Sequence, residues 1–210
     1  MNIKKIADKI IQFTVNRVIE ILGSSVSIIG LLLLISLMSY SPSDPNFIFP
    51  DNTKIHNLLG FQGSYISDLF FQSIGIIAYL LSLTLVITGI NVFKSKNLFL
   101  IIENIFFAIL YCNIGSLFFD FFHQNAFDLY INGNGGFVGQ YLSQTFFANL
   151  INLQTTFFYY FLIILILSLF FYSVNFHPRK FWTFLINNKK FFKKSESKNY
   201  TNKNEIINEY

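Results

Sequence analysis

The residues of this 210-residue chain that could do chemistry are few and lie far apart in the sequence. Its three histidines, His56, His123 and His177, have no metal-ligand spacing between them. Its single cysteine, Cys112, lies in an apolar segment with no neighbouring histidine or acid at a spacing that predicts a nucleophile, and alone it forms no intramolecular disulfide. The sequence therefore predicts no metal site, no cofactor and no enzyme.

Nucleotide hydrolysis requires a loop of the form G-x-x-x-x-G-K-[ST], in which backbone amides and a lysine hold the phosphates. No such motif occurs, and no glycine follows Gly139. The basic residues lie next to apolar segments, where anionic lipid headgroups are nearer partners than nucleic acid. We expect this chain by itself to bind neither ATP nor nucleic acid.

One acidic residue, Glu103, lies among apolar residues, and a charge at the centre of a bilayer costs about 2.5–3.5 kcal/mol. If the apolar stretch begins at Asn104, Glu103 lies at the membrane interface beside Lys96 and most of that cost disappears. We favour this placement over a proton or ion relay, which remains the alternative.

The elements that position these residues are apolar, because 53% of the chain is hydrophobic, 12% is charged and 28 residues are phenylalanine. A helix needs about 20 apolar residues to cross a hydrocarbon core of about 30 Å, and in lipid its backbone must bond internally. Four segments reach that length: 21–40, 69–93, 99–122 and 157–174. The expected fold is an all-α membrane protein, with a four-helix transmembrane bundle over residues 21–175.

The orientation follows from Lys and Arg, which concentrate in cytoplasmic flanks. Of the 15 basic residues, only Lys54 lies in the two loops on the other side of the expected spans. Those loops hold Asp44, Asp51, Asp68, Asp120 and Asp128. Both termini are therefore predicted to be cytoplasmic, and the membrane to be a bacterial inner membrane.

The N-terminal segment 1–20 carries Ile3, Ile6, Ile10 and Phe13 at helical spacing, with lysines off that stripe. This pattern predicts an amphipathic helix along the inner membrane surface. A cytoplasmic extension of the first span explains the pattern equally well.

After the last span, segment 176–194 alternates basic and aromatic residues, a pattern typical of a membrane interface. The residues expected to contact lipid headgroups are Arg179, Lys180, Trp182, Lys189, Lys190, Lys193 and Lys194. Segment 195–210 is rich in Ser, Asn, Lys and Glu, has too few apolar residues for a core, and is expected to be a disordered, linker-like tail.

Two loops on the outer side carry turn chemistry. Pro42 and Pro45 end any helix after the first span, and segment 64–71 is expected to form a short helix running into the second span. The second loop has a glycine cluster that permits close backbone approach. The candidate contact residues in these loops are Asp44, Pro45, Asn57, Gly60, Gly63, Asp68, Gly135, Gly136 and Gly139.

These loops resemble those of one known family. Residues 39–47 read SYSPSDPNF, which is similar to the S-Y-x-P-x-D-P-S segment of the N-terminal four-span membrane domain of the FtsK/SpoIIIE DNA translocases. Asn57, Gly60, Gly63 and Asp68 fit the family pattern N-x-x-G-x-x-G-A-x-x-A-D, with serines at the alanine positions 64 and 67. The glycines at 135, 136 and 139 fit its G-G-x-x-G. The resemblance covers residues 15–185.

The resemblance implies a septal membrane anchor of the cell-division and chromosome-partition machinery, in contact with the bilayer, with other division proteins and, as a suggestion only, with copies of itself. The motor that follows in the family is absent from these residues. A small transport or channel subunit, or the remnant of a split translocase gene, remains the alternative. We expect replacement of Asp44 and Pro45 by alanine to leave membrane insertion intact and to weaken septal recruitment.

Overall fold

The computed structural model describes residues 3–45, 54–124 and 133–176, and every regular element in these ranges is helical. The predicted lipid-interface residues and the linker-like tail lie outside the described residues, as do residues 46–53 of the first loop. Four described helical stretches are long and apolar enough to cross a membrane, which confirms the expected number of spans.

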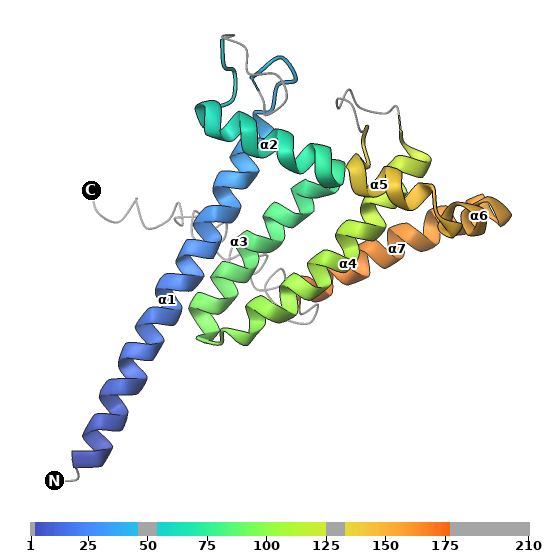
Figure 1. Ribbon diagram of the computed structural model, residues 1–210. Helices are drawn as coiled ribbons and strands as arrows, with labels where there is room; N and C mark the ends of the chain where they lie inside the picture. Colours follow the sequence, from blue (N-terminus) through green and yellow to red (C-terminus); the bar gives the residue numbers. More distant parts are fainter. Residues whose placement is uncertain (1–2, 46–53, 125–132, 177–210) are drawn as a thin grey trace, which may run out of the picture. The chain divides into compact units, whose positions relative to one another are not determined.

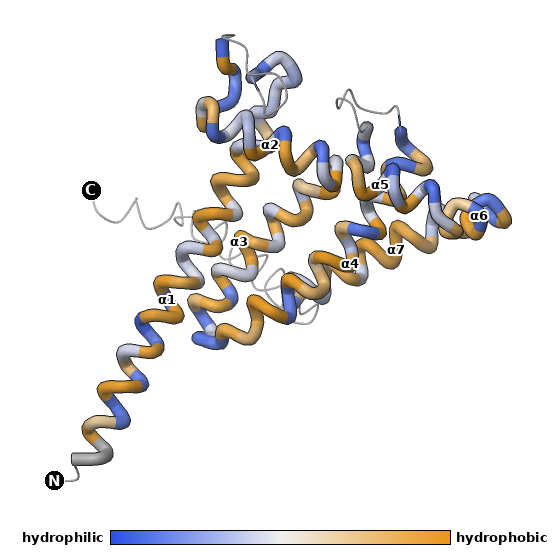
Figure 2. Tube along the Cα trace, in the orientation of Figure 1, coloured by the Kyte–Doolittle hydropathy of each residue, from blue (hydrophilic) through white to orange (hydrophobic). Residues whose placement is uncertain are grey.

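The first element, α1 (Ile3–Met38), is one continuous helix that ends before Pro42. At about 1.5 Å per residue it is about 54 Å long, well beyond a hydrocarbon core of about 30 Å. Figure 2 shows hydrophilic and hydrophobic turns alternating over its first part, before a mainly hydrophobic stretch. In the structure, segment 3–20 therefore extends the first span rather than forming a separate helix.

The second apolar segment is broken into two helices, α2 (Gly60–Ile74) and α3 (Ala78–Ser95), by a 3-10 turn at Gly75–Ile77. Gly75 has a φ of 69°, and a Cβ there would overlap the carbonyl oxygen of Asn134. Figure 1 shows α2 running across the ends of α1 and α3. The candidate span Gly60–Ser95 contains the expected span 69–93, and the turn at Gly75 divides it, with residues 69–74 in α2 and residues 78–93 in α3.

The remaining helices are α4 (Phe99–Phe122), α5 (Gly136–Ser143), α6 (Phe146–Leu153) and α7 (Thr155–Ser173). A tight turn at residues 96–98 joins α3 to α4, with Lys96 in the left-handed conformation at a φ of 55°. We call the end of the helices that carries this turn the turn end. The opposite end, where residues 39–45, 54–59, 123–124 and 133–135 lie, is the loop end.

The four spans lie in an open row (Figure 1). Among the described residues, α1 packs along α3, α4 packs along α7, and a smaller α3–α4 contact joins the two pairs. The α1–α3 pair is close because glycines line it: a Cβ on Gly23 would lie 2.9 Å from the carbonyl oxygen of Gly89. These glycines let the backbones of α1 and α3 approach closely, which favours packing of these two helices as a pair.

Buried polar side chains join α7 to α3 and α4. The Thr84 hydroxyl lies 2.7 Å from the Tyr111 hydroxyl and 3.1 Å from that of Ser173. Nearer the turn end, Asn104 donates to Thr88 at 2.9 Å and accepts from Asn175 at 2.8 Å. These bonds hold the last turn of α7 in place, since lipid offers polar groups no other partner.

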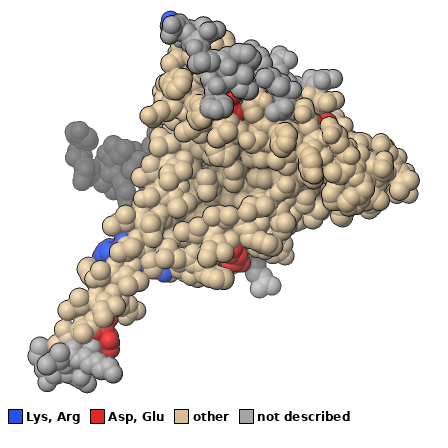
Figure 3. Space-filling model, viewed as in Figure 1, with Lys and Arg blue, Asp and Glu red and all other residues tan. Residues whose placement is uncertain are grey.

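The surface agrees with a membrane environment. On the face shown in Figure 3, the Lys, Arg, Asp and Glu side chains lie toward the edges, and a broad region between them carries none. Large apolar side chains are exposed on all four spans, including Ile29 of α1, Ile109 of α4 and Ile164 of α7. This protein is therefore a multi-pass membrane protein.

Candidate functional site: the loop end

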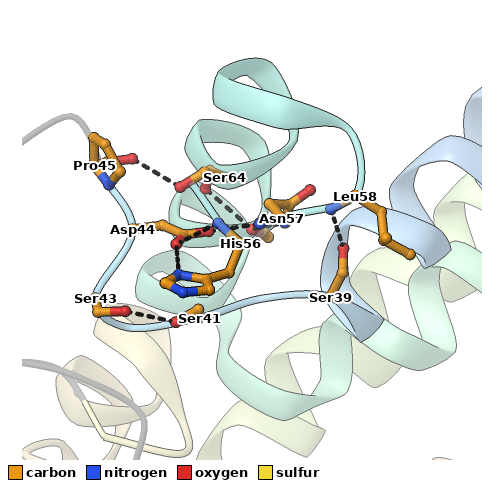
Figure 4. Close-up of polar contacts among 10 residues, drawn as sticks. Ser39, Ser41, Ser43, Asp44, Pro45, His56, Asn57, Leu58 and Ser64 are labelled. Atoms are coloured by element: carbon orange, nitrogen blue, oxygen red, sulfur yellow. Dashed lines mark hydrogen bonds and ion pairs between the residues drawn. The ribbon is translucent and has the colours of Figure 1, made fainter. Parts of the chain in front are cut away.

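Asp44 is the anchor of the first loop. Its side chain is fully buried, and its two carboxylate oxygens accept three hydrogen bonds (Figure 4). The backbone N–H of His56 donates to Oδ1 at 2.9 Å, and that of Asn57 donates to Oδ2 at 2.8 Å. The His56 ring nitrogen Nδ1 also lies 2.9 Å from Oδ1. One carboxylate thus fastens the two ends of the loop to each other.

Asn57 fastens this loop to α1 and to the start of α2. Its amide nitrogen donates to the carbonyl oxygen of Ser36 at 2.9 Å, and its Oδ1 accepts from the backbone N–H of Leu59 at 3.0 Å. Ser36 in turn donates to the carbonyl oxygen of Gly63 at 2.6 Å. A Cβ on Gly63 would overlap Asn57 Oδ1, so glycine permits this close approach.

The inward face of α2 is polar. Ser64 donates to the carbonyl oxygen of Pro45 at 2.7 Å, and Tyr40 donates to Asp68 at 3.2 Å. Ser64, Ser67 and Asp68 are all buried. Ser64 and Ser67 therefore bond within the loop end, and α2 buries its polar side.

The second loop packs against α4 through its glycines. Cβ atoms on Gly135 and Gly139 would lie 2.5 and 2.9 Å from the Cβ of Asp120, so α5 rests directly on α4 at that residue. The carbonyl oxygen of Asn134 accepts from the N–H of Ile76 at 3.0 Å. This bond connects the second loop to the break between α2 and α3, so the two loops form one continuous structure.

The predicted contact residues are thus brought together, but mostly inside the protein. Asp44, Asn57, Gly63, Asp68, Gly135, Gly136 and Gly139 are buried, and Gly60 is half-buried. Asp44 is 4% exposed, so in this conformation it shapes the loop and does not itself present a contact surface. Pro45 contributes its carbonyl oxygen to Ser64.

Several exposed residues of the loop end are large and apolar, and the sequence reasoning did not single them out. Leu58 is 77% exposed, and Phe61 and Leu69 are also exposed. On α5, Phe137 and Tyr141 are exposed one helical turn apart. The available signal was the spacing of positions 61, 65 and 69, which places apolar residues on the face of α2 opposite its serines. We call the exposed side chains of Leu58, Phe61, Leu69, Phe137 and Tyr141 the apolar rim.

The turn end carries an ion-pair cluster that the sequence reasoning also missed. Glu20 of α1 lies 3.0 Å from Lys96 and 2.5 Å from Arg17. The pair with Lys96 fixes the level of α1 against the α3–α4 turn. Glu103, the acid considered for a relay, is exposed in the second turn of α4.

The described residues contain no group of three or more His, Cys, Asp or Glu side chains that could hold a metal ion. What the loop end offers chemically is a fixed backbone framework with exposed apolar side chains above buried hydrogen bonds. Such an arrangement is suited to binding another surface.

Comparison with known proteins gives the family. A family model described as the 4TM region of DNA translocase FtsK/SpoIIIE matches residues 15–181. A protein named DNA translocase FtsK from Azospirillum brasilense is 39% identical over 79 residues, which are 37% of this chain and 12% of that protein. Proteins of the same name from Rickettsia bellii and Caulobacter vibrioides are 39% and 32% identical over 69 residues, 33% of this chain in both cases and 9% and 8% of those proteins. The matched stretch thus spans about a tenth of these relatives, and no solved structure matches the chain.

Proposed function

Because this chain belongs to the family of the 4TM region of DNA translocase FtsK/SpoIIIE, we propose that it is a septal anchor in a bacterial inner membrane. In this proposal both termini are cytoplasmic and the loop end faces outward. The proposal that both ends of the described chain lie on one side is supported by the ion pair of Glu20 with Lys96 near the α3–α4 turn and by the return of α7 toward that turn. The distribution of Lys and Arg supports that side as the cytoplasm.

The observation that carries the proposal is the loop end itself. A loop that only connects two spans needs no buried carboxylate with three hydrogen bonds, yet Asp44, Asn57 and Ser64 fix the first loop to α1 and α2. The bond from the N–H of Ile76 to the carbonyl oxygen of Asn134 joins the second loop to the end of α2. The apolar rim that this framework presents is suited to contact other membrane proteins of the septum. Predicted partners are therefore the bilayer and other division proteins.

Translocation of DNA is not proposed for these 210 residues. They contain no phosphate-binding loop, and the matched region of the relatives is a small part of each. Residues that bind ATP or nucleic acid would have to be supplied outside these 210 residues.

The transport alternative requires a broken helix near the middle of the bilayer, where unwound backbone binds the substrate. The break at Gly75 lies where α2 meets α3, at the loop end of the span, and the N–H of Ile76 within it donates to the carbonyl oxygen of Asn134 in the second loop. The break therefore builds the outer framework and favours the anchor over a transporter.

The experiment that tests the proposal is imaging of the chain with a C-terminal fluorescent fusion in dividing cells. The proposal expects a band at midcell, weakened by Leu58→Ser and Phe61→Ser together. Leu153→Ser is the matched control, because Leu153 is 76% exposed but lies on α6, outside the apolar rim. Even fluorescence around the membrane for the unaltered chain would sink the anchor proposal and leave a transport subunit or a gene remnant.

A further inference from the structure

Three buried polar atoms lie where the second loop meets the end of α4. Among the described residues, Asp120 Oδ1, Asn134 Oδ1 and His123 Nδ1 have no hydrogen-bond partner. The Asp120 side chain belongs to a residue that is only 6% exposed, and Asn134 is fully buried. Buried polar atoms are hydrogen-bonded in the great majority of native proteins, so each exception requires an explanation.

Two of these atoms, the oxygens of Asp120 and Asn134, belong to one tight contact. The amide nitrogen of Asn134 donates to the carbonyl oxygens of His123 and Gln124, the two residues that follow α4. A Cβ on Gly135, the residue after Asn134, would lie 2.5 Å from the Cβ of Asp120. These contacts hold Asn134 and Asp120 close to each other at the end of α4.

Asp120 differs from the other buried carboxylates of the loop end. Both oxygens of Asp44 accept hydrogen bonds, and Asp68 accepts one from Tyr40. Asp120 leaves one oxygen unpaired in the last turn of α4, which contains no basic residue, and no ion pair of the described residues includes it. The C-terminal end of a helix carries a partial negative charge, which disfavours an anion there and favours a cation.

We infer that Asp120 and Asn134 form a binding site for a divalent cation with oxygen ligands, and that Ca²⁺ is the ion that fits it best. Ca²⁺ binds carboxylate, side-chain amide and backbone carbonyl oxygens in flexible geometry. The two side chains offer the first two kinds of oxygen, and the last carbonyl groups of α4 can supply the third, because a helix end leaves them without a partner in the helix. Mg²⁺ fits less well, since it demands a near-ideal octahedron and retains its water, whereas both side-chain oxygens are buried.

The third unpaired atom, His123 Nδ1, is not one of the ligands in this inference. The His123 ring packs against the rings of Phe118 and Tyr159, at centroid distances of 5.2 and 5.9 Å. An imidazole nitrogen suits Zn²⁺ rather than Ca²⁺. No group of three His, Cys, Asp or Glu side chains among the described residues could complete a site of that kind. The oxygen atoms therefore decide the choice of ion.

A single carboxylate predicts weak binding, because the affinity of Ca²⁺ sites depends on the number of charged ligands. We expect a Kd of about 10⁻³ M, at the weak end of the range for Ca²⁺ sites of extracellular modules. In the proposed orientation the site lies on the outer side of the membrane and takes its Ca²⁺ from that side. This source of the ion rests on the proposed function, whereas the site itself does not.

The inference is tested by hydrogen–deuterium exchange of the chain in lipid nanodiscs, which leave both sides open to the buffer. With about 10 mM Ca²⁺ and a Kd of about 1 mM, backbone N–H groups of residues 133–139 should exchange about tenfold more slowly. Asp120→Asn keeps the shape of the side chain and removes its charge, so it should abolish the effect of Ca²⁺. Glu103→Gln is the matched control and should retain the effect, because Glu103 is an exposed carboxylate of the same helix.

Three results would overturn the inference: no slowing by Ca²⁺ in the unaltered chain, equal slowing in the Asp120→Asn protein, or equal slowing by NaCl at the same ionic strength. Slowing by Zn²⁺ and not by Ca²⁺, lost in a His123→Gln protein, would also overturn it and assign the site to the histidine. Calorimetric titration of the unaltered chain with CaCl₂ should show binding, whatever Asp120→Asn does to the fold, and no binding would refute the site. These measurements do not involve the septum, so they succeed or fail independently of the proposed anchoring.

Discussion

Replacing Asp44 by alanine should open the first loop while leaving the spans in the membrane. The side chain is fully buried and accepts hydrogen bonds from the backbone N–H groups of His56 and Asn57 and from the His56 ring. Alanine removes all three acceptors. The spans insert through their apolar length, to which this carboxylate contributes nothing.

The magnitude follows from the kind of bond lost. A hydrogen bond to a charged group contributes about 1.5–3 kcal/mol, and a buried donor left without a partner costs about 1–3 kcal/mol. Because the opened loop regains water, we expect a net loss of about 3 kcal/mol in the free energy of local opening. That corresponds to roughly 150-fold faster hydrogen exchange at the two backbone N–H groups.

The assay is hydrogen–deuterium exchange of the chain in lipid nanodiscs, followed at peptides that contain residues 54–60. His56→Ala keeps both backbone bonds and removes only the ring contact, so it should accelerate exchange by less than about tenfold. Ser41→Ala is the control in the same loop, because among the described residues the Ser41 hydroxyl bonds to the exposed Ser43 hydroxyl at 2.9 Å and not to the backbone N–H groups of His56 and Asn57. If backbone N–H groups in the Asp44→Ala protein exchanged no faster than those in the Ser41→Ala protein, the conclusion that Asp44 holds the first loop closed would be refuted.

Gly89→Leu should separate α1 from α3, because any Cβ at this position overlaps the α1 backbone. A cross-link engineered across the α1–α3 interface should be lost in this variant and retained in an Ile90→Leu control. Asn104→Leu should lower the melting temperature in detergent by several degrees, since it leaves the Thr88 hydroxyl without its partner; a temperature equal to that of the unaltered chain would contradict the polar link. Glu20→Lys should lower the melting temperature and the double variant with Lys96→Glu should restore it, whereas additive losses would argue against the pair.

The number of spans was determined by the sequence, because bilayer thickness fixes the length of an apolar helix independently of tertiary contacts. Segments 99–122 and 157–174 agree closely with α4 and α7 for this reason. The short helix expected at residues 64–71 is present inside α2. The family resemblance rested on loop motifs and is confirmed by the match over residues 15–181.

The break at Gly75 was not visible in the sequence. Hydropathy runs through α2 and α3 without interruption, and a glycine within an apolar stretch is compatible with a continuous membrane helix. The turn exists because Asn134, nearly sixty residues away along the chain, approaches Gly75 too closely for any side chain. The direction of α2 is therefore a tertiary property.

In the candidate site too, the sequence determined some features and the tertiary structure determined others. Sequence motifs identified Asp44, Asn57 and Gly63, because a family pattern preserves the residues on which a loop depends. Only the structure decided that these residues face inward and that Leu58 and Phe61 face outward, since exposure depends on what packs above each side chain. For Asn113, the sequence shows an amide in a span, and the tertiary structure decides that its side chain is exposed on α4 among the described residues. Span length and composition are local quantities that the sequence determines alone, whereas burial and hydrogen-bond partners arise between distant segments and exist only once the chain has folded.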